Sequence, residues 1–139
     1  MLVVTVILMA CPTNQNMKPE ETDGELSPCP KSPNCVSSLS EDKSHYVAPL
    51  TYEATLEEAR EKLISVMNSM KRSKIVTAEI DYIHATFKSA LFGFVDDVEF
   101  SFNDQKKIIN LRSASRMGYS DLGVNRKRVE EIRKRFVNP

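Results

Sequence analysis

The residues best suited to chemistry lie between Arg112 and Arg128, in the stretch RSASRMGYSDLGVNRKR. This stretch combines arginines with hydroxyl side chains and two glycines, in a chain whose formal net charge is zero. Guanidinium groups, hydroxyls and the free N–H groups at the start of a helix all donate hydrogen bonds to anions. The stretch therefore indicates either an anion-binding corner or a set of arginines that pair with carboxylates from elsewhere in the fold.

Both interpretations use the same residues. Asp97 is expected to face Arg112 across a β-hairpin, and further acids would be close enough to pair with the other arginines. Internal pairs of this kind fix geometry without adding much stability. The alternative is that the arginines hold an external carboxylate, phosphate or lipid headgroup. The candidate residues are Asp96, Asp97, Arg112, Ser113, Ser115, Arg116, Asp121, Asn125, Arg126 and Arg128.

These residues do not suggest a catalytic set. The serines have no histidine neighbour in sequence, and His84 is expected within a strand as a half-buried sheet residue. Asp96 and Asp97 are adjacent on a predicted strand and would point to opposite faces, so they would not form a carboxylate dyad. No glycine-rich phosphate loop or metal-ligand cluster is recognisable, so no cofactor and no metal are expected.

The N-terminus has the pattern of an export signal. Residues 2–9 form an apolar run that is much shorter than the ~20 residues needed to span a bilayer. It ends in Leu8-Met9-Ala10-Cys11, which resembles the cleavage box of bacterial lipoproteins, where a diacylglycerol is attached to the cysteine. A buried strand over residues 3–8 is the alternative interpretation.

The residues that follow Cys11 have the composition of a tether. Residues 12–28 hold three prolines, a glycine and four acids, and they cannot bury enough apolar surface to offset the entropy of ordering. This order favours an envelope protein anchored in a membrane through lipidated Cys11, with a soluble cytoplasmic protein as the alternative. The predicted division is a signal segment over 1–11, a tether over 12–28 and one domain over 29–139.

The two remaining cysteines, Cys29 and Cys35, lie in the sequence CPKSPNC. Prolines restrict this short loop to turn-like shapes that can bring its ends together, and export would place it in an oxidising compartment. A disulfide is therefore the favoured interpretation. A metal site would need two further ligands, and a redox-active pair would be expected to have the C-x-x-C spacing.

Local patterns predict two helices and about four strands. A capping box at Thr55 and Glu58 begins a helix over 56–71, and a second amphipathic helix covers 125–136. Strands are predicted over 75–79, 82–88, 95–102 and 107–114. The economical arrangement is an α+β fold, an antiparallel sheet with both helices packed on one face.

The last two predicted strands should form a hairpin with its turn at residues 103–106. Centring the hairpin there pairs residues whose numbers sum to 209, which places Phe100 opposite Ile109 and Asp97 opposite Arg112. The apolar alternation of both strands agrees with this register, because a slip by one residue would expose the core faces.

Three blocks of the chain resemble the signature blocks of domain-of-unknown-function family 1499. They are CPKSPNCVSS at 29–38, FGFVDDVEF at 92–100 and RSASRMGYSDLGVNRKRVEEI at 112–132. The resemblance implies a protein that is often a bacterial envelope lipoprotein or exported, with plant relatives in chloroplasts. It implies no activity, but it supports treating the ten candidate residues as one unit.

The combined prediction is an exported, lipid-anchored domain that binds or scaffolds a component of the envelope without catalysis. The alternative is a small enzyme or carrier for an anionic metabolite or lipid at Arg112, Arg116 and Arg126. The expected partners are the membrane, through Cys11, and an anionic small molecule or lipid headgroup. Nucleic acid is not expected, because an exported protein would not meet it.

Overall fold

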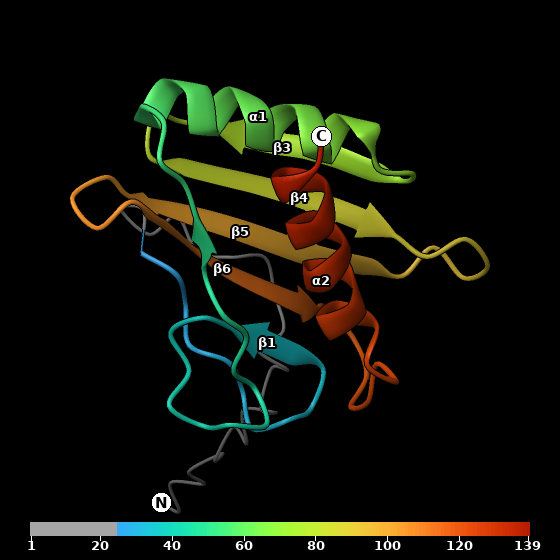
Figure 1. The fold of residues 1–139 in the computed structure, drawn as a ribbon. Coiled ribbons are helices and arrows are strands. Elements are labelled where there is room, and N and C mark those ends of the chain that lie inside the picture. The colour runs from blue at the N-terminus through green and yellow to red at the C-terminus, as the bar shows by residue number, and fades with distance from the viewer. Residues whose placement is uncertain (1–24) are drawn as a thin grey trace, which may run out of the picture.

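The structure is a computed structural model that describes residues 25–139 (Figure 1). The predicted signal segment, the lipidation site Cys11 and most of the predicted tether lie outside the described residues.

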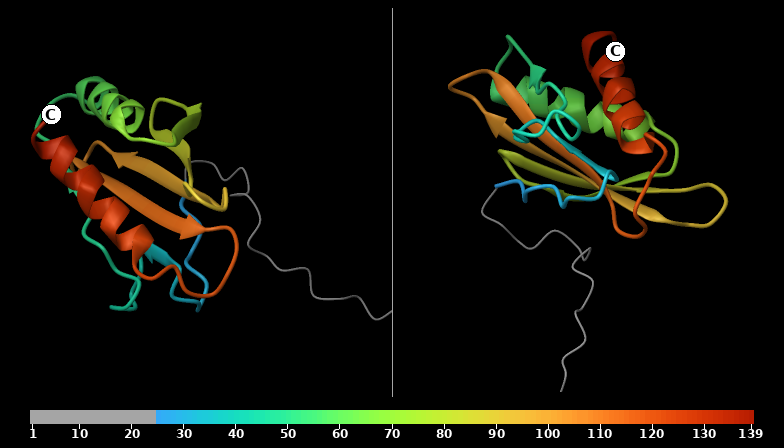
Figure 2. Two further views of the ribbon diagram at one scale, coloured as in Figure 1. Left: turned by 90° about the vertical axis from the view of Figure 1, so that its right-hand side faces the viewer. Right: turned by 90° about the horizontal axis from the view of Figure 1, so that it is seen from below.

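The described residues form an antiparallel sheet with two helices on one of its faces (Figures 1 and 2). The predicted α+β class is confirmed, although the sheet has six strands in place of about four. The elements in chain order are β1 (Cys35–Ser37), β2 (Leu50–Thr51), α1 (Leu56–Ser69), β3 (Ser73–Ala78), β4 (Tyr82–Lys88), β5 (Val95–Asn103), β6 (Ile108–Ser115) and α2 (Val124–Val137). The strand order is β1-β6-β5-β4-β3, and β2 also pairs with β6. The two extra strands are three and two residues long, which is too short to display a period of two in the sequence.

The core lies between the sheet and the helices. Leu63 and Met67 of α1 and Ile132 of α2 are fully or almost fully buried against sheet residues such as Phe100 and Leu111. The capping box predicted for α1 is present. The Thr55 side chain accepts a hydrogen bond from the backbone N–H of Glu58, and the Glu58 side chain accepts one from the backbone N–H of Thr55. Burial of these apolar stripes fixes which face of each helix meets the sheet.

The β5–β6 hairpin has the predicted faces but a different register. Paired residues sum to 211, so Phe100 lies opposite Leu111, and Arg112 lies opposite Glu99. The predicted pairing of Asp97 with Arg112 is wrong. The loop is shifted by one residue, to 104–107, because Lys107 takes the left-handed conformation and closes it. The difference of two residues keeps the same side chains in the core, so the apolar pattern does not distinguish the two registers.

The second face of the sheet carries polar side chains. Because Val98 and Phe100 point to the helices, their neighbours Asp97 and Glu99 point to the opposite face. Both carboxylates are nevertheless buried. This separation of faces decides how the candidate residues are grouped.

Candidate functional site

The candidate residues occupy both faces of the sheet and do not form a single corner. Asp97, Arg112 and Arg116 lie on the face away from the helices, where Tyr82, His84 and Glu99 join them. These six residues are called the outer row below. A second group lies on the other face, where the sheet meets the start of α2, and it is called the helix-side network. Its members are Asp96, Ser113, Ser115, Asp121, Asn125 and Arg128.

Glu99 is the centre of the first half of the outer row. Its side chain is fully buried, and it accepts hydrogen bonds from the Tyr82 hydroxyl at 2.7 Å and from Nη1 of Arg112 at 3.3 Å. Burial and the hydrogen bond to Glu99 raise the pKa of Tyr82 above its ordinary range, so this hydroxyl stays a donor. The Nε atom of Arg112 is buried and has no hydrogen-bond partner within residues 25–139. This end of the row is a buried ion pair with one unused donor.

Asp97 is the centre of the second half. Arg116 donates two hydrogen bonds to it as a bidentate pair, from Nε to Oδ2 at 2.7 Å and from Nη2 to Oδ1 at 2.8 Å. Nε2 of His84 lies 2.7 Å from Oδ1 of the same carboxyl group. Burial raises the pKa of Asp97, but the hydrogen bonds of Arg116 and His84 outweigh it, and the pKa falls to about 2. Asp97 is therefore ionised under all ordinary conditions.

The pKa of Asp97 predicts a loss of stability in acid. Its value is 3.8 in a model compound and about 2 in the fold, so the ionised carboxylate stabilises the fold above roughly pH 4. This contribution, about 2 kcal/mol, disappears as the pH falls from about 4 to about 2. Denaturant titrations at several pH values should show that wild type loses about 2 kcal/mol more than Asp97→Asn over this range. Equal losses in the two proteins would contradict the assignment.

The helix-side network joins the start of α2 to the sheet. Asn125 is fully buried and bonds to the hydroxyls of Ser113 at 2.6 Å and Ser115 at 2.9 Å. Arg128 donates to Oδ2 of Asp96 at 2.6 Å and to Oδ1 of Asn125 at 2.8 Å. The Arg128 guanidinium also lies 4.7 Å from the centre of the Phe87 ring. Each of these polar groups has a partner inside the chain.

Asp121 supplies the negative charge at the start of α2. Its carboxylate accepts from the N–H of Gly123 at 2.8 Å, the N–H of Asn125 at 3.0 Å and the Asn125 side chain at 2.8 Å. Burial raises the pKa of Asp121, but the hydrogen bonds from Asn125 and Gly123 lower it below its usual value. The residue in the N-cap position is Gly123, which has a positive φ, so Asp121 caps the helix from two positions upstream.

Arg126 belongs to neither group. Its Nη1 donates to the carbonyl of Tyr46 at 2.8 Å, and its Nη2 donates to the carbonyl of Ser44 at 2.9 Å. It therefore holds the loop before β2 against α2 and pairs with no carboxylate within the described residues. Sequence patterns contain no signal for this contact, because it joins residues about eighty positions apart.

The contacts of the candidate residues suit a structural role better than a catalytic one. Four guanidinium groups are bonded to carboxylates or carbonyls of the chain, which favours the internal ion-pair interpretation. Tyr82, His84 and Glu99, which are not among the ten candidate residues, complete the outer row. The acids at positions 97 and 99, two residues apart on β5, were visible in the sequence, but only the register of the sheet places Glu99 opposite Arg112.

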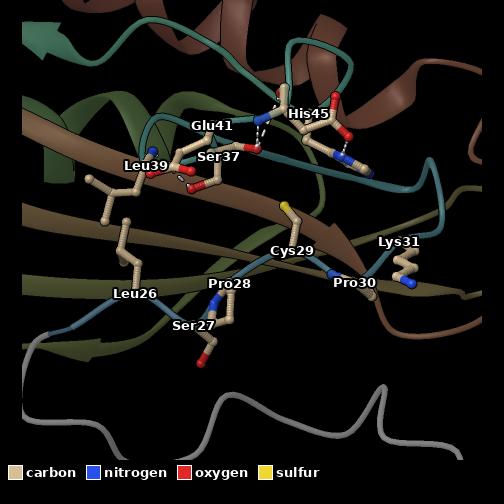
Figure 3. Close-up of a pocket in the computed structure, with 12 residues that line it drawn as sticks. Leu26, Ser27, Pro28, Cys29, Pro30, Lys31, Ser37, Leu39, Glu41 and His45 are labelled. Atoms are coloured by element: carbon tan, nitrogen blue, oxygen red, sulfur yellow. Dashed lines mark hydrogen bonds and ion pairs between the residues drawn. The ribbon is translucent and has the colours of Figure 1, made fainter.

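A separate cavity of about 460 Å³ lies between the segment that holds Cys29 and the loop that ends at His45 (Figure 3). The predicted disulfide is confirmed there, because Cys29 and Cys35 are bonded with their Cα atoms 5.7 Å apart. Both ring nitrogens of His45 are engaged, with Nδ1 3.0 Å from Asp42 and Nε2 3.0 Å from the carbonyl of Ser32. The cavity lining is Leu26, Ser27, Pro28, Cys29, Pro30, Lys31, Ser37, Leu39, Ser40, Glu41, Asp42 and His45.

Neither a cluster of metal ligands nor a bilayer-spanning helix occurs in the part of the chain that the structure describes. Within residues 25–139, no group of three or more histidine, cysteine, aspartate or glutamate residues is arranged to hold a metal ion. None of the helices in this part of the chain combines the length and the apolar character needed to cross a bilayer.

The fold and its contacts define a disulfide-bonded α+β domain that has buried ion pairs on both faces of one sheet. The chain belongs to the family described as "Protein of unknown function (DUF1499)", whose model matches residues 25–136. No curated protein and no solved structure matches the chain.

Proposed function

We propose that the chain is an exported, lipid-anchored protein of the cell envelope, whose domain binds or scaffolds another component without catalysis. The Cys29–Cys35 disulfide carries this proposal, because disulfides form and persist in oxidising compartments outside the cytoplasm. The lipobox-like sequence that ends at Cys11, and the polar residues after it, support attachment to a membrane. Several acyl chains on one cysteine would hold the domain firmly.

The absence of a catalytic role is proposed because the reactive groups are occupied by one another. The Ser113 hydroxyl donates to Asn125, and the His84–Asp97 pair is completed by Arg116 and not by a nucleophile. Such contacts hold the fold together and leave no group poised as nucleophile or base among the candidate residues.

The test of anchoring is Cys11→Ala in the full chain. The wild-type protein is expected in the membrane fraction and labelled by a radioactive fatty acid, whereas Cys11→Ala is expected to be unlabelled and released from the membrane. Cys11→Ala removes the acceptor sulfur and leaves the domain unchanged. An unlabelled wild-type protein, or a variant that retains the whole membrane-bound fraction, would refute the proposal.

A carrier for a small anion is the second candidate, and one observation favours it. Nε of Arg112 has no acceptor within the described residues, and the ion pair with Glu99 is 3.3 Å long. A phosphate or carboxylate that displaced the side chains covering Nε would supply the missing acceptor. A carrier should show a higher melting temperature with inorganic phosphate, citrate or glycerol phosphate, and Arg112→Lys should abolish the rise. Unchanged melting temperatures with all three anions would remove this candidate.

A further inference from the structure

Two loops at one end of the sheet expose large apolar side chains. The β4–β5 loop carries Leu91, Phe92 and Phe94, and the β6–α2 loop carries Met117, Tyr119 and Leu122. Each of these side chains is between 53% and 87% exposed. These six residues are called the apolar tip below. Scattered apolar residues on a surface need no explanation, but six on two neighbouring loops indicate an interaction site.

The two loops begin side by side at one end of the sheet. The β4–β5 loop leads into β5 and the β6–α2 loop follows β6, and these two strands are paired from Asp96 and Ser115 onward. The N–H of Arg116 also donates to the carbonyl of Val95 at 3.1 Å, which ties the base of one loop to the base of the other. Figure 1 shows both loops at the same end of the sheet, with the β4–β5 loop projecting beyond it.

The backbone of the β4–β5 loop presents its aromatic rings together. Gly93 takes the left-handed conformation between the two phenylalanines, and their ring centres lie 5.6 Å apart. A left-handed turn is readily available to glycine and costly for other residues, so the chain is well suited to this shape. Neither Phe92 nor Phe94 belongs to the hydrophobic core. The pair is therefore displayed outward and does not serve packing.

Exposed lysines flank the apolar tip. Residues 89–95 hold no charged side chain, and Lys88 and Lys127 are exposed at the edges of the two loops. The one acid of the β6–α2 loop, Asp121, is occupied by N–H groups at the start of α2. Asp96 beside the tip is paired with an arginine. Among the described residues, two exposed lysines thus flank the apolar tip, and the two nearest acids in sequence are bonded within the fold, which suits contact with an anionic lipid surface.

We infer that the apolar tip inserts into the interfacial layer of a bilayer that contains anionic lipids. The inference rests on the proposed function, which places the domain beside a membrane. Aromatic and aliphatic side chains on projecting loops suit the boundary between headgroups and acyl chains, and the lysines would contact the phosphates. The 14 residues from Cys11 to Glu25 span about 46–50 Å at full extension, which sets the greatest distance between Glu25 and the bilayer that holds the anchor.

The test uses tryptophan as a reporter, because the chain contains none. Phe92→Trp places the reporter in the tip, and Ile80→Trp places it in the exposed β3–β4 turn at the other end of β4. The lipidated full-length protein is mixed with vesicles of phosphatidylethanolamine and phosphatidylglycerol. The Phe92→Trp emission should shift to shorter wavelength and be quenched by lipids with brominated acyl chains. The Ile80→Trp emission should change in neither respect.

Controls separate the tip from the anchor and from a protein partner. Lys88→Glu with Lys127→Glu should weaken the quenching at least several-fold, and vesicles of phosphatidylcholine alone should also give weaker quenching. An unshifted Phe92→Trp emission in an anchored protein overturns the inference and leaves the Cys11 result intact. Equal shifts at both reporter positions, or a shift that requires membrane proteins in the vesicles, overturn it as well.

Discussion

Glu99→Ala is expected to lower the free energy of unfolding by about 3–5 kcal/mol, the largest effect of any single substitution on the outer row. The Glu99 side chain is fully buried, and it accepts from both Tyr82 and Arg112. Removing it leaves a largely buried guanidinium and a buried hydroxyl without their acceptor, and it also opens a cavity. Denaturant unfolding followed by circular dichroism measures the loss.

The matched control is Glu130→Ala. Glu130 forms an ion pair of 3.3 Å with Arg133, but its side chain is 58% exposed, so its loss should change the free energy of unfolding by no more than about 0.5 kcal/mol. Glu99→Gln keeps the side-chain volume and removes the charge. Its free energy of unfolding should fall by more than half as much as that of Glu99→Ala. A Glu99→Ala protein within 1 kcal/mol of wild type would show that the buried pair contributes little.

Arg128→Met is expected to lower the free energy of unfolding by about 3 kcal/mol. Methionine is also long and unbranched, but it removes the cation that lies 2.6 Å from Asp96 and stacks on the Phe87 ring. Asp96 is then a nearly buried carboxylate without its partner, and Asn125 loses a donor. Thermal and denaturant unfolding should both report the change.

Lys127→Met is the control for this effect, because Lys127 is exposed and occupies the same turn of α2. Its replacement should change the free energy of unfolding by no more than about 0.5 kcal/mol. Arg128→Lys keeps the positive charge but lacks the planar guanidinium group. Its free energy of unfolding should fall by less than that of Arg128→Met. Similar losses in Arg128→Met and Lys127→Met would argue against a specific role for the Asp96 pair.

The predicted interactions differ from the observed ones mainly in partner choice. Asp97 was expected to meet Arg112, but it pairs with Arg116, and Arg112 meets Glu99. The apolar alternation of a strand has a period of two, so it identifies the faces of β5 and β6 but accepts any register that differs by two residues. The loop decided between these registers, through the left-handed conformation of Lys107.

Local chemistry was sufficient for several features. The capping box located the start of α1, the alternation of β4 predicted its bounds without error, and the proline-rich loop predicted the disulfide. These features depend on residues that are close together in the chain, so short patterns contain the information. The predictions for residues 1–24, including lipidation of Cys11, concern a part of the chain that the structure does not describe and stay predictions.

The sequence by itself determined the α+β class, the core faces, the helix signals and the cysteine pair. Only the tertiary structure decided that the candidate residues divide between two faces, that Glu99 is buried in the outer row and that Arg126 binds carbonyls near residue 45. The same applies to β1 and β2, whose pairing with β6 gives strand structure to segments with little pattern of their own. The physical reason is that these contacts join distant segments. Their partners are chosen by register and packing, which a local period does not encode.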